Sequence, residues 1–248
     1  MSVVIACKFN NGVIIASDRQ VTRGYEKVED KISKVQKIDG KSIIIGGVGS
    51  LRDMQKMKAA STKLFSTSDK LTENECIKII NNISSVYQEL GLIETGKIIQ
   101  SLDGEYLFVD SYNINFVGYD LGVISGFDYY VIGSGNNLAT GYLNVEFKDK
   151  NPNDLTSENI IKILKNAIKV SCKNNITIDD NVDIYILYKD AIDLIDDSNI
   201  EIINKCEYDI LDKSKPKSEC NKNCKSCSHE LKIIYSKKDK TIKMLSTN

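Results

Sequence analysis

The sequence has a single histidine, His229, among its 248 residues. A catalytic dyad built on histidine is therefore excluded unless His229 itself serves. The sequence also has no long apolar run: stretches such as Val13–Ala16 and Ile43–Val48 are far shorter than the roughly 20 residues of a membrane-spanning helix. Neither sign of charge is in excess, because 33 basic and 34 acidic residues leave a formal net charge of −1. We expect no overall electrostatic attraction to nucleic acid or to an anionic membrane.

The first residues lack the charged segment and the following apolar segment that mark a secretory signal peptide. We therefore expect a cytoplasmic protein, in which the seven cysteines are mostly reduced. Apolar residues make up 42% of the chain and charged residues 27%, which is the balance of a soluble globular protein with a substantial core.

The order of apolar patterns along the chain predicts the fold class. Two β-branched runs, 2–9 and 13–16, are separated by Asn10-Asn11-Gly12, which predicts a β-hairpin. Short strands are expected within 19–40, longer strands over 41–48, 105–110, 113–119, 128–132, 182–188 and 231–235, and helices over 51–66, 72–90, 136–147 and 157–173. Because strands and helices come in groups, we expect an α+β protein with two sheets stacked between helix layers, and not a doubly wound parallel sheet.

Polar residues at the ends of the predicted hairpin could carry chemistry. Removal of Met1 would give Ser2 a free α-amine, which titrates near neutral pH and can accept the proton of the Ser2 hydroxyl. The hairpin brings Asp18 towards Ser2, and Lys34 could pair with Asp18. The amides of Gly46 and Gly47 could approach a developing oxyanion. On residue types alone, a solvated lysine and an aspartate at a hairpin end explain the same pattern.

Four separated motifs occur in a fixed order along residues 2–195. They are the N-terminal segment from Ser2-Val-Val-Ile through Ser17-Asp18-Arg19 to Thr22, then Lys34-Val35 with Ile38-Asp39, then Ile45-Gly46-Gly47-Val48-Gly49, and Tyr130-Val131-Ile132-Gly133-Ser134-Gly135. Together these motifs resemble the proteasome β subunits and the bacterial protease HslV, which are N-terminal-nucleophile (Ntn) hydrolases.

The resemblance implies a role for each matching residue. Ser2 would be the nucleophile, Asp18 and Lys34 would tune its proton transfer, the amide of Gly46 would stabilise the oxyanion with Gly47 as a further candidate, and Ser134 would contact the amine. It also implies the four-layer αββα sandwich and peptide-bond hydrolysis inside a ring-shaped homo-oligomer. An unfoldase ATPase would be the partner, and no cofactor would be needed for catalysis.

Two departures from the family pattern stand out. The nucleophile is serine and not threonine, so the methyl group that helps to fix the rotamer is missing. The positions that match the supporting aspartate and serine of proteasome β subunits are Asn175 and Ile178, and the segment around them is more similar to HslV. With only Met1 before Ser2, we expect activation by removal of the initiator methionine.

We expect a hydrolase domain over residues 1–195, followed by a Lys- and Asp-rich extension over residues 196–248. The extension contains a second cluster of residues, Cys220, Cys224, Cys227 and His229, which we call the C-terminal cysteine cluster. Three thiols and one imidazole at this spacing predict a structural zinc site. Free surface thiols and a redox pair are the alternatives.

Two other functions remain open at this point. One is a specialised acyl-transfer enzyme on the same fold, a small-amide hydrolase or a peptide ligase, that uses the same Ser2 ester. The other is a catalytically silent scaffold subunit that keeps Met1. The spacing of Asp18 and Lys34 argues against the scaffold, whereas Asn175 and Ile178 keep it open.

Overall fold

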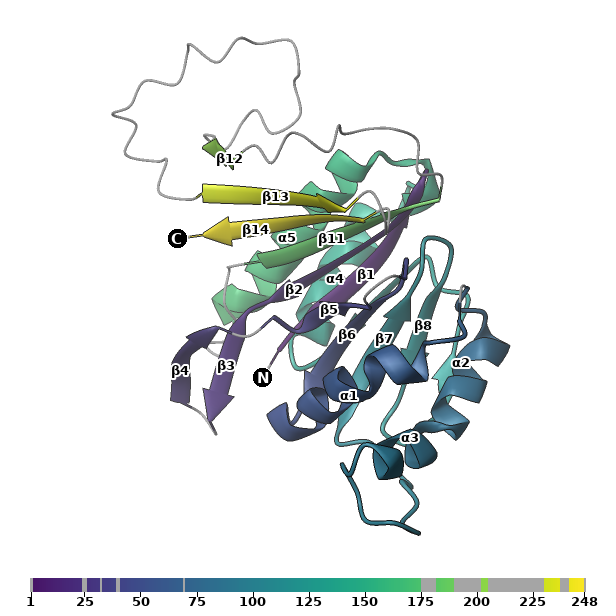
Figure 1. Ribbon diagram of the computed structural model, residues 1–248. Coiled ribbons are helices and arrows are strands. Elements are labelled where there is room, and N and C mark those ends of the chain that lie inside the picture. The colour runs from purple at the N-terminus through teal and green to yellow at the C-terminus, as the bar shows by residue number, and fades with distance from the viewer. Residues whose placement is uncertain are drawn as a thin grey trace.

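The computed structural model describes residues 2–23, 26–31, 33–38, 41–68, 70–174, 182–189, 202–204, 230–236 and 241–247. One sheet has seven strands in the order β10-β1-β2-β11-β14-β13-β12, and every pair is antiparallel. Its members are β1 (Val4–Phe9), β2 (Gly12–Asp18), β10 (Tyr129–Ile132), β11 (Val182–Tyr188), β12 (Ile202–Asn204), β13 (Glu230–Ser236) and β14 (Thr241–Thr247). Figure 1 shows β1 and β2 running side by side beneath β11, β14 and β13.

A second antiparallel sheet has five strands in the order β5-β6-β7-β8-β9. Its members are β5 (Val35–Lys37), β6 (Ile44–Gly49), β7 (Gly104–Val109), β8 (Ile114–Val117) and β9 (Val123–Ile124). A separate hairpin of β3 (Gln20–Arg23) and β4 (Glu26–Lys31) leaves the end of β2 (Figure 1).

Five α-helices lie in two groups within the described residues. The first group is α1 (Leu51–Leu64), α2 (Glu73–Asn81) and α3 (Ile83–Glu89), and the second is α4 (Asn136–Glu146) and α5 (Ser157–Asn174), with a short 3₁₀ turn η1 (Pro152–Asp154) between α4 and α5. No helix in the described part of the chain is long and apolar enough to cross a membrane.

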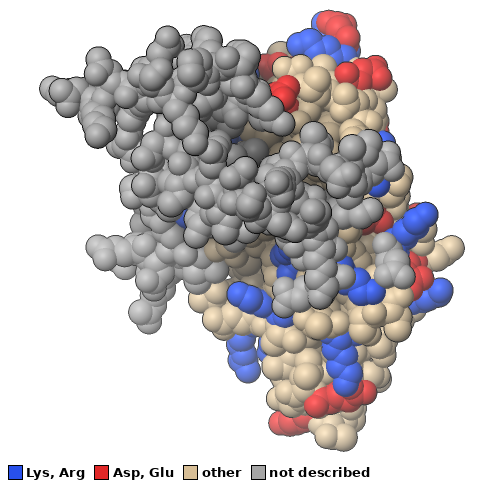
Figure 2. Space-filling view, turned by 45° about the horizontal axis from the view of Figure 1, so that its top comes forward, with Lys and Arg blue, Asp and Glu red and all other residues tan. Residues whose placement is uncertain are grey.

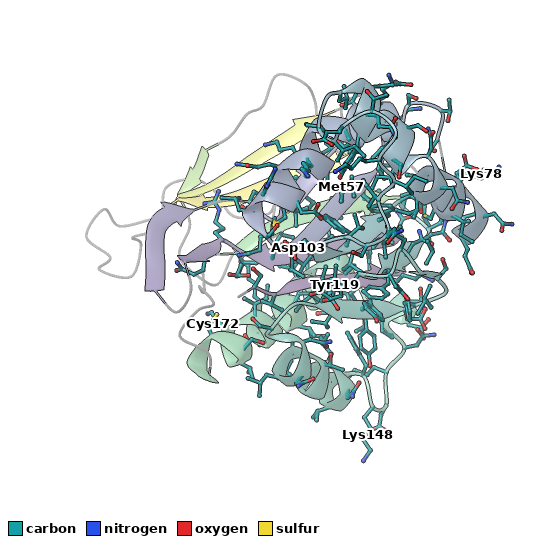
Figure 3. The ribbon with its side chains drawn as sticks, turned by 90° about the horizontal axis from the view of Figure 1, so that it is seen from below. Met57, Lys78, Asp103, Tyr119, Lys148 and Cys172 are labelled. Atoms are coloured by element: carbon teal, nitrogen blue, oxygen red, sulfur yellow. The ribbon has the colours of Figure 1, made fainter. Side chains whose placement is uncertain are left out.

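Three apolar clusters show how these elements pack. The first lies between the seven-stranded sheet and α4 with α5, and includes Ile5, Ile14, Leu143, Leu164 and Ile184. The second lies between the five-stranded sheet and α1, α2 and α3, and includes Ile45, Phe108, Met57, Ile80 and Tyr87. The third lies between the two sheets, and includes Val4, Ile15, Ile44, Leu107 and Tyr185. In Figure 3, Met57 of α1 and Cys172 of α5 accordingly lie on opposite sides of the strands.

The alternation of side chains along each strand explains this division. In β2, Ile14 and Ala16 belong to the cluster beneath α5, whereas Val13 and Ile15 face the second sheet. All seven residues of β2 are buried, because both faces of the sheet are covered. A strand covered on both faces reads as a continuous apolar run, and the Val13–Ala16 run has this origin.

The predicted elements and the observed ones agree at most positions. The hairpin forms as expected, and Thr72 caps α2 through its side chain, which accepts a hydrogen bond from the Glu75 N–H. The single helix expected over 72–90 is instead two helices divided at Asn82. The backbone N–H of Asn82 donates to the carbonyls of both Lys78 and Ile79, so the helix tightens at a residue with weak helix propensity.

The region after residue 196 contributes strands to the same sheet as β1 and β2. β14 pairs with β11, and β13 pairs with β14, which extends the sheet beyond the predicted strand 182–188. β13 corresponds to the predicted strand 231–235, while β14 was not expected. The C-terminal cysteine cluster, like Asn175 and Ile178, lies outside the described residues.

The described surface does not carry a single sign of charge. On the face shown in Figure 2, basic and acidic side chains are scattered among uncharged ones. This distribution agrees with the near-zero net charge of the sequence.

Candidate active site

The hairpin of β1 and β2 brings Asp18 to the start of the chain. Val4 lies opposite Ser17 in the ladder, so Val3 and Asp18 are the next facing residues. The Asp18 N–H donates to the Val3 carbonyl at 3.3 Å, and the Val3 N–H donates to Asp18 Oδ1 at 2.8 Å. The predicted closeness of Asp18 to the segment headed by Ser2 is therefore present in the structure.

Lys34, just before β5, inserts its ammonium group at the end of β2. Its Nζ donates to Asp18 Oδ2 at 2.8 Å, to the Asp18 carbonyl at 3.1 Å and to the Gln20 carbonyl at 2.8 Å. The side chains of Lys34 and Asp18 are 4% and 0% exposed, so the ion pair is almost completely removed from water. The three acceptors use all three hydrogens of an ammonium group.

Burial raises the pKa of Asp18 above its ordinary value, and the charge and hydrogen bond of Lys34 and the N–H groups of Val3 and Gln20 lower it in turn. The Gln20 N–H donates to Asp18 Oδ2 at 3.1 Å. All the groups that contact the Asp18 carboxyl in these bonds are donors, a pattern that an ionised carboxylate satisfies. We therefore take Lys34 as a charged ammonium and Asp18 as a charged carboxylate, and burial of the carboxylate charge is costly.

The turn between β10 and α4 holds Ser2. The Ser2 N–H donates to Ser134 Oγ at 3.0 Å. The Ser2 carbonyl accepts from Ser134 Oγ at 3.3 Å and from the Gly135 N–H at 3.2 Å. A Cβ on Gly133, which has φ of +95°, would lie 2.3 Å from the Ser2 carbonyl oxygen, so this turn needs glycine there. The nitrogen that contacts Ser134 becomes the α-amine once Met1 is removed.

Gly46 and Gly47 are neighbours on β6, and the Cα of Gly46 faces β1 and β2. A Cβ on Gly46 would come within 2.7 Å of Val4 and 2.8 Å of Ile15, so glycine there allows the two sheets to approach. The Gly47 N–H donates to the Lys34 carbonyl at 2.9 Å. This hydrogen bond fixes the backbone of Lys34 against β6. The Gly47 amide could bind an oxyanion only if this hydrogen bond were shared or broken.

Three groups of this site were not predicted from the sequence. They are the Gln20 carbonyl, which accepts from Lys34, the Gly135 N–H, and Glu105, whose Oε2 accepts from the Gly133 N–H at 3.2 Å. The first two are backbone groups, which a pattern of residue types cannot predict. Glu105 could have been noticed in the sequence, because it is a charged residue at the start of an apolar strand.

The sequence is similar to those of known proteasome subunits. The family described as "Proteasome subunit" matches residues 2–187. The proteasome subunit beta of Nanoarchaeum equitans is 30% identical over 215 residues, which cover 78% of this chain and 96% of the relative. The proteasome subunit beta type-2 of Saccharomyces cerevisiae is 28% identical and covers 75% of this chain and 68% of its own.

Solved structures show the same fold. Eukaryotic HslV from Trypanosoma brucei has a TM-score of 0.57 at 16% identity, covering 75% of this chain and 99% of its own. BPH from Thiobacillus denitrificans in complex with epoxomicin has a TM-score of 0.58 at 14% identity, covering 76% and 99%. The resemblance expected from the four motifs is confirmed. The chain belongs to the proteasome subunit family, whose members are peptidases of compartmentalised particles, and it shares its fold with HslV.

Proposed function

We propose that this chain is catalytically active as an N-terminal serine peptidase with Ser2 as its nucleophile. In this mechanism the Ser2 hydroxyl attacks the carbonyl carbon of the scissile peptide bond. The Ser2 α-amine accepts the hydroxyl proton and delivers a proton to the leaving amine. Water then hydrolyses the resulting ester on Ser2 and restores the hydroxyl.

The observation that carries this proposal is the buried Lys34–Asp18 pair beside Val3, with Ser134 on the nitrogen of Ser2. A fixed positive charge near the hydroxyl favours its deprotonated form. Asp18 holds that charge in place, while Val3 connects Asp18 to the reacting residue through one hydrogen bond of 2.8 Å. Ser134 Oγ, at 3.0 Å, would orient the amine. The amide of Gly46 is the proposed oxyanion donor, and the Gly47 amide joins it only if its bond to the Lys34 carbonyl is shared or broken.

The proposal is tested by the intact mass of the purified protein before and after exposure to a β-lactone that acylates N-terminal serine or threonine. We expect loss of Met1 and addition of one inhibitor per chain at Ser2. A chain that keeps Met1 and takes up no inhibitor would instead support the silent scaffold. The family assignment does not favour that function or the acyl-transfer enzyme.

The same family assignment supports several finer proposals. Members form oligomeric rings, so we propose a homo-oligomeric ring that receives unfolded protein from an unfoldase ATPase in the cytoplasm. The three apolar clusters support a four-layer αββα sandwich for the described fold. Degradation of an unfolded casein-type substrate would distinguish this peptidase from a ligase that cleaves one defined sequence.

We also propose that the C-terminal cysteine cluster binds one structural zinc ion. The support is the spacing of Cys220, Cys224, Cys227 and His229 in a segment too polar to build a core of its own. No group of three or more potential ligands occurs in the part of the chain that the structure describes. The proposal therefore concerns this cluster alone and leaves the mechanism at Ser2 unchanged.

A further inference from the structure

Glu105 interrupts an apolar row that faces the other sheet. In β7, Leu107 and Val109 belong to the cluster between the two sheets, whereas Tyr106 and Phe108 face the helices. By the alternation of a strand, Glu105 points the same way as Leu107 and Val109. A carboxylate is costly to bury at such a position unless it finds hydrogen-bond donors.

The donor that Glu105 finds is the turn that holds Ser2. Glu105 Oε2 accepts from the Gly133 N–H at 3.2 Å, and its side chain is half-buried. Val48, which lies opposite Glu105 in the β6–β7 ladder, approaches the same glycine: a Cβ on Gly133 would be 3.1 Å from Val48 Cγ1. The end of the five-stranded sheet therefore contacts the turn through one apolar and one charged residue.

This contact joins the two halves of the site. Ser2 and the 133–135 turn belong to the seven-stranded sheet, whereas Lys34 leads into β5 of the other sheet. The ammonium group is held at the end of β2 by Asp18 and Gln20, so the contact between the sheets bears on the orientation of Ser2 in the 133–135 turn and not on the position of the ammonium. Apolar packing between sheets is not directional, whereas a hydrogen bond between a carboxylate and an N–H has a defined length and direction.

We propose that Glu105 is a positioning residue for the Ser2 nucleophile. It acts by holding the Gly133 N–H, so that Ser134 and Gly135 keep the nitrogen and the carbonyl of Ser2 in register with Lys34. The inference rests on the proposed function of Ser2. It predicts that the acceptor atom at this place matters, and that the negative charge itself does not.

Two conservative variants separate the acceptor from the charge. Glu105→Gln keeps the length of the side chain and a carbonyl oxygen for the Gly133 N–H, but removes the charge. Glu105→Asp keeps the charge but is one methylene shorter, so its oxygens fall short of Gly133. Asp103→Asn serves as the charge control: Asp103 lies near Tyr119 at the same end of β7 (Figure 3), and removing its charge leaves the bond to Gly133 in place.

The experiment measures the rate of β-lactone addition to Ser2 by intact mass, kcat and KM for a fluorogenic peptide, and exchange of the Gly133 amide. We expect E105Q and D103N to stay within about threefold of the wild type. We expect E105D to lower kcat and the rate of acylation by about 10- to 100-fold with little change in KM, because misplacement of a reacting group by about 1 Å has effects of that size. The Gly133 amide should exchange faster in E105D than in E105Q.

The outcomes distinguish this inference from the proposed function. A wild-type protein that takes up no β-lactone would overturn the role of Ser2 itself. With an active wild type, E105D rates equal to the wild type would overturn the positioning role. A fall in E105Q as large as in E105D, with a shifted pH profile, would also overturn it, since the charge and not the acceptor would then act. Burial, and next the charge of Glu105, raise the pKa values of Tyr119 and Tyr130. These two tyrosines would therefore contribute to the shifted pH profile.

Discussion

Replacement of Lys34 by methionine tests the buried ion pair at the centre of the site. Methionine fills most of the volume of lysine but offers no hydrogens. Asp18 would then keep the N–H groups of Val3 and Gln20 and lose its countercharge at 2.8 Å. The carbonyls of Asp18 and Gln20 would lose their donor as well.

The expected loss of stability follows from burial. At 2.8 Å and an effective dielectric constant of about 20, the attraction between the two charges amounts to about 6 kcal/mol, which offsets the cost of removing both from water. Breaking a buried pair on one side only typically costs about 3–5 kcal/mol, because the remaining charge is left uncompensated. Removing both charges, in Asp18→Asn with Lys34→Met, should cost less than K34M alone by about 1–3 kcal/mol.

The pH dependence of this difference gives a second readout. Burial already raises the pKa of Asp18, and loss of Lys34 raises it further. A raised pKa in the folded state means that stability is fully present below the pKa of the unfolded state and is lost as the pH rises through the folded value. The folded K34M protein binds the proton of Asp18 more tightly than its unfolded chain does. The disadvantage of K34M relative to the double variant should therefore grow as the pH rises above the ordinary pKa of an aspartate, which is about 3.9.

The assay is urea unfolding of the wild type, the two single variants and the double variant, at one protein concentration because assembly contributes to stability. K34M should also lower turnover by several orders of magnitude, and K34R should not rescue it, since a planar guanidinium does not replace a point charge. Effects of the single variants that simply add in the double variant, with no dependence on pH, would refute the reasoning from a buried pair.

Four further predictions concern the rest of the chain. Ser2→Ala should abolish hydrolysis and leave the fold intact, whereas Ser2→Thr should retain activity. Full activity of S2A would refute the proposed mechanism. Light scattering should give a particle of several hundred kilodaltons, and a monomer would favour a stand-alone amidase or ligase. Elemental analysis of protein prepared without chelator should find about one zinc per chain, and its removal should leave the acylation of Ser2 unchanged. Cys7 and Cys76 are buried, and burial raises the pKa of Cys76 to about 12, so both thiols should resist alkylation until the protein unfolds.

The local patterns of the sequence predicted most of the secondary structure correctly. Alternation and turn residues depend on neighbouring residues, and the hairpin that they predict was found. The break at Asn82 was missed because the apolar stripe of the helix continues across it: Ile80 and Ile83 are both buried in one cluster. The position of β14 could not be foreseen, because pairing with β11 joins residues about 60 positions apart.

Residue types and their spacing made Ser2, Asp18 and Lys34 candidates, and the resemblance to proteasome β subunits and HslV implied a role for each. Only the tertiary structure decided that Lys34 reaches Asp18 with a side chain that is 4% exposed, and that Glu105 meets the turn holding Ser2. Such contacts depend on the packing of two sheets whose core is apolar and therefore unspecific in direction. The bonds that complete the site involve backbone carbonyls and N–H groups, which every residue carries and no sequence pattern distinguishes.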